Sequence, residues 1–235
     1  MKKIIVGMAT FPGREEVVKL AMDSLRPQCD EIFLYDNGKE PFDITDLGKF
    51  QGLHRIKEPC FYLSCDDDLL YPPTYCQDMV EAIKRTGSIV SHHGRILAGL
   101  DLNYYFGHLS YRCLGKIDKE RFIDVAGTGV SGWDTEYFNP LNLIYSKDMK
   151  MSDLVFSLEA AKQKKHITIL THEKGYINHL PIDMSKTICA TEQRNCDRQG
   201  QLANEILKLN SRKWSILKYI RYVGFSHNLN LFKDW

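Results

Sequence analysis

The chain has 235 residues, 43% of them hydrophobic and 26% charged, a composition that predicts a folded protein with a sizeable core and excludes a disordered chain. Its 31 basic and 30 acidic residues give a formal net charge of +1, which excludes tight nucleic-acid binding through overall charge. The seven cysteines lack the paired CxxC spacing of a zinc site and predict free thiols in a reducing cytosol. Ile4–Ala9 is too short for a signal sequence, and no stretch approaches the roughly 20 apolar residues of a spanning helix. We therefore expect a cytoplasmic protein.

The first 38 residues predict a strand, a helix and a second strand. Ile4–Ala9 is a short apolar run, followed by a turn that contains Thr10 and Arg14. Apolar positions then recur at helical spacing until Pro27, and Glu31–Tyr35 forms the next strand-like run. Such a unit favours parallel pairing and predicts an α/β fold with a mostly parallel central sheet flanked by helices. Ligands of such sheets bind beyond the carboxyl ends of the strands.

Three consecutive carboxylates, Asp66, Asp67 and Asp68, follow the apolar run Phe61–Cys65. They repel one another, and aspartate is unfavourable in a strand, so this run needs an external reason such as a hard divalent cation. Mg²⁺ and Mn²⁺ are typically held by one or two carboxylates and leave other positions to water and phosphates. In an extended chain Asp66 and Asp68 point to the same side, which predicts a metal–diphosphate site. The alternative is an acidic cap of the helix that begins at Pro72 and Pro73.

The remaining periodicity predicts two types of element. We expect strands at Leu53–Ile56, Ser88–Ser91, Arg121–Ala126 and His166–Leu170. We expect helices at Thr74–Thr86, Met151–Lys162, with Ser152 as a possible cap, and Gln199–Leu209.

Several polar residues lie at the predicted ends of these elements. Adjacent histidines, His92 and His93, point to opposite faces of an extended segment and make a poor metal chelate. Asp153 lies in the first turn of its helix, where the helix dipole favours a carboxylate. His172 follows the last predicted strand on the ligand side of a parallel sheet.

The stretch Gly127–Asp134 contains three glycines, which permit close approach of the backbone to a ligand. Its spacing is not that of a dinucleotide or P-loop fingerprint, so we do not expect it to cradle phosphates. We instead expect an acceptor-site loop that includes Gly129, Trp133 and Asp134.

In their order along the chain these motifs resemble glycosyltransferases of the GT-A fold, in particular the family 2-like nucleotide-sugar transferases. The matching stretches are Ala9–Arg14, Leu34–Gly38, Asp66–Asp68 with Tyr71–Pro73, and Met151–Ser157. The resemblance implies a GT-A-type catalytic domain over residues 1–180 and a short helical C-terminal extension, residues 181–235, that packs on it.

The resemblance also implies roles for individual residues. Nucleotide-sugar binding falls to Thr10, Pro12, Arg14, Asp36, Asp66 and Asp67. Asp68, with a weaker match at His172, would hold Mn²⁺ or Mg²⁺. Asp153 would be the general base that takes a proton from the acceptor hydroxyl, and one base with one backside displacement predicts inversion at the anomeric carbon.

The sequence thus predicts a metal-dependent, inverting glycosyltransferase that uses a nucleoside-diphosphate sugar, with UDP the commonest nucleotide in the resembling family, and a glycan or lipid-linked acceptor. Three alternatives remain: a bacteriophage-type glycosyltransferase of a hydroxymethylated DNA base, a metal-dependent nucleotidyltransferase, and a sugar-nucleotide binding module without catalysis. The tail Ser211–Tyr222 mixes basic and aromatic residues, which suits peripheral contact with the inner membrane face or contact with DNA.

Overall fold

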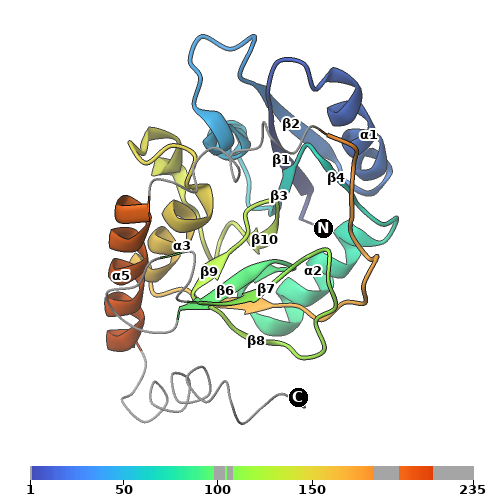
Figure 1. Ribbon diagram of the computed structural model, residues 1–235. Coiled ribbons are helices and arrows are strands. Elements are labelled where there is room, and N and C mark those ends of the chain that lie inside the picture. The colour runs from blue at the N-terminus through green and yellow to red at the C-terminus, as the bar shows by residue number, and fades with distance from the viewer. Residues whose placement is uncertain (1, 98–103, 105–107, 183–195, 214–235) are drawn as a thin grey trace.

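A computed structural model describes residues 2–97, 104, 108–182 and 196–213 (Figure 1). Its centre is a seven-stranded sheet with the strand order β2-β1-β3-β10-β5-β11-β8. The strands are β1 (Ile4–Thr10), β2 (Glu31–Asp36), β3 (Phe61–Asp66), β5 (Ile89–Ser91), β8 (Arg121–Phe122), β10 (Val130–Asp134) and β11 (Ile167–Ile169).

The sheet is mixed but mostly parallel, which confirms the predicted α/β class. β1 pairs in parallel with β2 and β3, and β11 pairs in parallel with β5. β10 runs antiparallel between β3 and β5, and β8 is antiparallel to β11 at the edge. The carboxyl ends of β1, β3 and β5 consequently lie at the same edge of the sheet as the beginning of β10.

Helices cover both faces of the sheet (Figure 1). They are α1 (Glu15–Leu25), α2 (Tyr75–Thr86), α3 (Ser152–Lys162) and α5 (Cys196–Lys213), with 3₁₀ segments η1 (Arg26–Gln28), η2 (Thr45–Arg55) and η3 (Leu141–Tyr145). α1 and α2 lie on one side of the sheet, and α3 and α5 lie side by side on the other.

Alternation along the strands explains these layers. Ile5 and Tyr62 belong to a buried core with apolar residues of η2, α3 and α5, whereas their neighbours Val6 and Leu63 belong to a second core with α1 and α2. The α5 residues in the first core include Leu202 and Ile206. The helix from the predicted C-terminal extension therefore shares a core with the sheet.

Two small sheets complete the fold around the edge where β1 and β3 end. One is formed by β6 (Gly94–Leu97), β7 (His108–Tyr111) and β9 (Val125–Ala126), and the other by β4 (Leu69–Leu70) and β12 (Asn178–His179).

Two local predictions were wrong. Leu53–Ile56 is not a strand, because Leu53 belongs to η2, whose glycines Gly48 and Gly52 let it pack closely on the rings of Tyr35 and Phe33. The expected strand Arg121–Ala126 is divided into β8 and β9. The division lies at buried Asp124, whose carboxylate accepts hydrogen bonds from the Leu97 backbone and the Asn210 side chain.

The described cysteines with an assigned state, Cys29, Cys60, Cys65, Cys76 and Cys113, are free thiols. Within the described parts of the chain, no helix combines the length and apolarity needed to cross a bilayer. Residues 214–235 lie outside the described residues, and with them most of the tail for which we predicted contact with a membrane or DNA.

Candidate functional site

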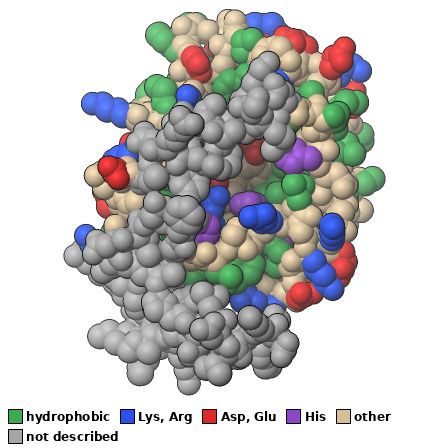
Figure 2. Space-filling model, viewed as in Figure 1, with side chains coloured by type: hydrophobic (Ala, Val, Ile, Leu, Met, Phe, Trp, Pro, Cys, Tyr) green, Lys and Arg blue, Asp and Glu red, His purple; other side chains and the backbone are tan. Residues whose placement is uncertain are grey.

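A pocket of about 640 Å³ opens at the edge of the sheet where β1 and β3 end. Its walls come from the turn after β3, from η2 and β6, from residues 127–130, and from the beginning of α3. Figure 2 shows this face of the molecule, hollowed between acidic, basic and histidine side chains. The position agrees with the rule for ligand sites in open α/β sheets, and the volume suits a small-molecule ligand.

Asp67 ties the acidic turn to the loop after β1. Its side chain is buried and accepts hydrogen bonds from the Thr10 hydroxyl at 2.7 Å and from an Arg14 guanidinium nitrogen at 2.6 Å. Burial raises the pKa of Asp67, while Thr10 and Arg14 oppose that shift. The structure thus brings Thr10 and Arg14 to the acidic run, with Thr10 buried beneath it and Arg14 lining the pocket.

Asp66 is the last residue of β3 and lines the pocket. Its Oδ1 forms an ion pair with the ammonium of Lys49, a buried side chain on η2. Burial alone would lower the pKa of Lys49, but the carboxylates of Asp66 and Asp46 raise it above its ordinary value, so Lys49 remains charged. The sequence analysis did not single out Lys49 and Asp46, because Lys39–Gly52 is rich in Gly, Asp and Pro and is typical of a connection between elements.

Asp68 is the third carboxylate of the turn. Burial together with Asp66 and Asp67 raises the pKa of Asp68 to about 6, and its nearest cation is Arg14, 3.7 Å away. The described residues contain no group of three His, Cys, Asp or Glu side chains that could hold a metal ion. A hard cation that binds substrate phosphates needs only one or two carboxylates, and Asp66 and Asp68 both line the pocket. This donor set fits Mn²⁺ or Mg²⁺.

Two glycines of the predicted acceptor loop make room for pocket side chains. A Cβ atom at Gly129 would lie 1.8 Å from Oδ2 of Asp66, and one at Gly127 would lie 2.7 Å from Cβ of His93. Both glycines line the pocket. The missing side chains at Gly129 and Gly127 therefore make room for the side chains of Asp66 and His93.

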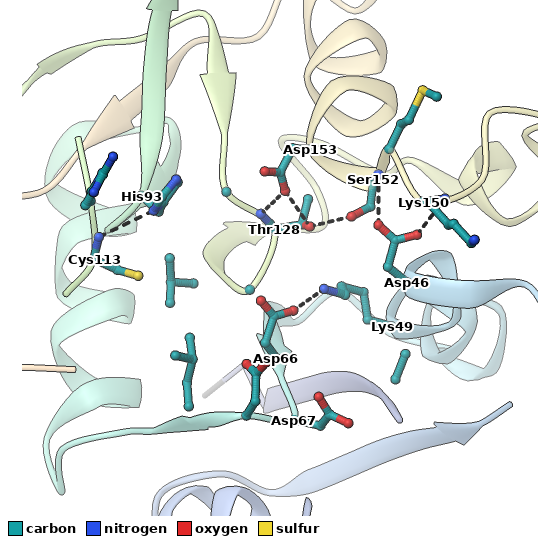
Figure 3. A pocket seen from close by; sticks show the side chains of 18 of the residues that line it. Asp46, Lys49, Asp66, Asp67, His93, Cys113, Thr128, Lys150, Ser152 and Asp153 are labelled. Atoms are coloured by element: carbon teal, nitrogen blue, oxygen red, sulfur yellow. Dashed lines mark hydrogen bonds and ion pairs between the residues drawn. The ribbon is translucent and has the colours of Figure 1, made fainter. Parts of the chain in front are cut away.

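Asp153 lines the opposite side of the pocket, in the first turn of α3 (Figure 3). Its Oδ1 accepts hydrogen bonds from the Thr128 backbone nitrogen at 2.8 Å and the Thr128 hydroxyl at 2.9 Å. Its Oδ2 lies 3.6 Å from a guanidinium nitrogen of Arg95. Thr128 thus orients the Asp153 carboxylate through its two hydrogen bonds to Oδ1.

Asp46 fixes the approach to α3. Its carboxylate accepts hydrogen bonds from the backbone nitrogens of Lys150 and Ser152, each at 3.0 Å. Ser152, the possible cap in the sequence analysis, is the first residue of the helix, and no side-chain cap hydrogen bond is formed. The capping carboxylate comes instead from η2.

His93 lies on a flank of the pocket between the walls that carry Asp66 and Asp153 (Figure 3). Its Nδ1 accepts the backbone N–H of Cys113 at 3.4 Å, so the ring proton is on Nε2. Burial, followed by the charge of Arg95, lowers the pKa of His93 to about 4. His93 is therefore a neutral hydrogen-bond donor. As predicted, His92 points the other way, into the core.

Trp133 and Asp134 do not lie at the pocket, which corrects our acceptor-site assignment. Trp133 is fully buried, with its ring centroid 5.1 Å from those of both Tyr62 and Phe156. Asp134 binds the ammonium of Lys2 at 2.6 Å. Because β10 is antiparallel to β3, Asp134 lies opposite Phe61 at the other edge of the sheet. Of the three predicted acceptor residues, only Gly129 lines the pocket.

His172 is also placed away from the pocket. Its Nδ1 lies 3.1 Å from Nδ1 of His92 in a buried pair, so it does not join Asp68 as a metal ligand in this structure. Asp36 and Pro12 are likewise not among the lining residues. Asp36 forms an ion pair with Lys39 at 2.7 Å.

Other lining residues were not singled out from the sequence. They include Arg95, Arg112, Lys150 and Gln199. The spacing of His93 and Arg95, two apart in an extended segment, was a signal that both side chains face one side. Gln199 arrives from α5, and nothing in its local sequence indicates the pocket.

Comparisons with known proteins do not assign a family. No protein-family profile and no curated protein matches the chain. Among solved structures, a similar chain carries the description "Crystal Structure of A197 from STIV", with 12% identity and a TM-score of 0.42, over 78% of this chain and 87% of that one. A similarity of this size supports no inference about function.

Proposed function

We propose that the chain is a metal-dependent, inverting glycosyltransferase of the GT-A type, which moves a sugar from a nucleoside-diphosphate sugar to a hydroxyl of a glycan or lipid-linked saccharide. The observation that carries this proposal is that Asp66 and Asp68 line one side of a pocket whose other side holds an oriented carboxylate, Asp153. The order of motifs along the chain, which resembles the family 2-like enzymes, supports the same assignment.

Asp68, with Asp66 beside it, would hold Mn²⁺ or Mg²⁺. When bound, such a cation stabilises the charge that develops on a departing nucleoside diphosphate. Asp67 has a different task, because Thr10 and Arg14 occupy its oxygens. It anchors the loop after β1 and holds Arg14 at the pocket, where the guanidinium adds positive charge for the phosphates.

Asp153 accepts the proton of the attacking hydroxyl. A sugar hydroxyl is a weak nucleophile, and a positioned base contributes about 10²- to 10⁴-fold to its reaction. Thr128 holds Oδ1, which leaves Oδ2 as the oxygen available to the acceptor. A single base that faces the donor from the far side of the pocket supports direct displacement and hence inversion.

The first test measures donor binding. Calorimetry with a panel of nucleoside diphosphates and their sugars, with and without Mn²⁺, should identify one nucleotide whose binding depends on the metal. Asp68→Ala should abolish that dependence. If no nucleotide in the panel shows metal-dependent binding, the proposal is wrong.

The second test concerns Asp153→Asn. The amide oxygen can still accept both hydrogen bonds from Thr128, so we expect nucleotide affinity to stay within about twofold while transfer falls about 10²- to 10⁴-fold. Release of the nucleoside diphosphate in the presence of glycan, lipid-linked and hydroxymethylated-DNA acceptors provides the assay. The matched control is Asp134→Asn, at the other edge of the sheet, which should retain transfer. Full turnover by Asp153→Asn would exclude it as the base.

A further inference from the structure

The charged side chains that line the pocket are balanced in number, but they are not all paired with one another. Five aspartates and five lysines or arginines line it. Arg14 binds Asp67, Lys49 binds Asp66, and Arg95 lies 3.6 Å from Asp153. Arg112 has no ion-pair partner among the described residues, although its side chain is exposed at the pocket.

Arg112 is held in place by its backbone. It follows β7 in a short turn that is closed by a hydrogen bond of 2.9 Å from the Gly115 nitrogen to the Arg112 oxygen. The next residue, Cys113, donates its backbone N–H to the His93 ring. The guanidinium is also close enough for its charge to contribute, with that of Arg95, to the lowered pKa of His93. Arg112 therefore belongs to the flank of the pocket that carries His93 and Arg95.

This flank is the acceptor side if the proposed function holds. The attacking hydroxyl must lie within hydrogen-bond reach of Asp153, and Arg95 is the cation nearest to that carboxylate. The donor phosphates belong instead beside the acidic turn, where Arg14 and Lys49 supply positive charge. An uncharged acceptor would leave the exposed Arg112 guanidinium without a counter-charge among the described residues.

We infer that the acceptor carries an oxyanion, a phosphate or a carboxylate, and that Arg112 binds it and thereby determines acceptor specificity. The planar guanidinium matches the geometry of either oxyanion and can donate two parallel hydrogen bonds to it. Neutral His93 adds its Nε2–H as a donor to an adjacent hydroxyl. This inference rests on the proposed function and deepens it by naming the chemical class of the acceptor.

The test uses protein saturated with Mn²⁺ and the nucleoside diphosphate that the binding panel identifies. Four probes are titrated by calorimetry: glucose, glucose 6-phosphate, glucuronate and inorganic phosphate. We expect at least one anionic probe to bind about 10- to 100-fold more tightly than glucose, as one charge-assisted bidentate contact provides. The glucose 6-phosphate and glucuronate titrations separate a phosphate-bearing acceptor from a carboxylate-bearing one.

Arg112→Gln should remove this preference without changing nucleotide affinity, and Arg112→Lys should retain part of it. Arg26→Gln is the matched control, because Arg26 is an exposed arginine outside the pocket and its loss changes net charge equally. Equal binding of glucose and the anionic probes, or no binding of any anionic probe, overturns the inference. Weaker nucleotide binding by Arg112→Gln also overturns it, because Arg112 would then serve the donor phosphates. Failure of the proposed function is seen separately, as absent metal-dependent nucleotide binding before any probe is added.

Discussion

Asp66 can occupy its place in the pocket because residue 129 has no Cβ atom. The backbone at Gly129 has little freedom to move away, since its carbonyl accepts hydrogen bonds from the Tyr71 hydroxyl at 2.8 Å and from the Asp66 backbone nitrogen at 3.2 Å. A methyl group at this position, 1.8 Å from Oδ2, must therefore displace the Asp66 carboxylate. The Asp66 carboxylate can therefore keep its position only if residue 129 is glycine.

We predict that Gly129→Ala weakens metal-dependent nucleotide binding by about tenfold or more, because a carboxylate displaced by about 1 Å no longer offers the same ligand geometry. Calorimetry with Mn²⁺ measures this effect, and circular dichroism checks that the fold is kept. Gly115→Ala is the matched control, since Gly115 also lines the pocket but an added Cβ would come no closer than 3.3 Å to a neighbour. Equal nucleotide affinity in the two variants would show that the position of Asp66 does not govern binding.

Helix α5 brings one buried polar group to the pocket. The Gln199 side chain is 3% exposed, and its Oε1 has no hydrogen-bond partner among the described residues. An unsatisfied buried acceptor costs about 1–3 kcal/mol. A group retained at such a cost is suited to accept a hydrogen bond from a hydroxyl of the proposed sugar substrate.

Gln199→Leu should therefore raise the free energy of unfolding by about 1 kcal/mol while it lowers transfer. Urea denaturation and the nucleotide-release assay measure the two effects on the same protein. Gln201→Leu on the same helix is the control: this side chain is exposed, so we expect a change within about 0.5 kcal/mol and unaltered transfer. If Gln199→Leu proved less stable than the wild-type chain, the amide would have a structural partner and not a role in binding.

The elements differ in how far the sequence could predict them. Apolar runs such as Phe61–Cys65 are buried on both faces of the sheet, so their pattern alone indicated central strands. In η2 the apolar residues Leu47, Phe50 and Leu53 recur every three positions, the period of a 3₁₀ helix, but intervening glycines gave the appearance of a connection. Because η2 was not predicted, its two pocket residues, Asp46 and Lys49, were not predicted either.

The segment around Trp133 shows the same error, in which glycines favoured a loop. Three glycines within Gly127–Asp134 predicted a flexible segment, yet five of these residues form β10 at the centre of the sheet. Gly132 is suited to that position because an added Cβ would lie 2.5 Å from the Leu63 side chain. β10 pairs with β3 and β5, which are distant from it in sequence, so this pairing cannot be predicted from a local stretch of residues.

At the scale of the whole molecule, the pocket is assembled from segments between Ala9 and Gln199. The acidic turn and Asp153 could be predicted because each follows a recognisable element and parallel sheets gather such ends at one edge. Arg95 and Arg112 could not, since β6 and β7 belong to a separate small sheet whose position depends on tertiary packing. The half of the candidate site that carries the acidic turn was thus more predictable than the half that carries Arg95 and Arg112.

Titration of buried groups adds a property of the whole fold, the dependence of its stability on pH. Burial lowers the pKa of His92 to about 3, that of His93 to about 4, and that of His172 below its ordinary value. As pH falls below 6.5, the unfolded chain binds protons that these folded histidines refuse, so the stability present above pH 6.5 is lost by up to about 1.4 kcal/mol per pH unit for each histidine. Asp68 acts in the opposite direction. Because its folded pKa is about 6, the folded chain binds a proton before the unfolded one between about pH 6 and 4.

Asp67, whose pKa burial also raises, acts in the same direction as Asp68. The three histidines outnumber these two carboxylates, so we predict that metal-free protein loses stability steadily from pH 6.5 to 4.5. Urea denaturation in the presence of a chelator measures the slope. His92→Phe should reduce the slope of unfolding free energy against pH by the contribution of one proton, because phenylalanine does not titrate. Phenylalanine also keeps an aromatic ring beside Tyr75 and Tyr176, so the packing is preserved. Asp68→Asn should make it steeper, because it removes the group that gains a proton on folding. A slope that neither substitution changes would mean that other groups control the acid sensitivity of the fold, and that burial in this sheet does not hold His92 neutral.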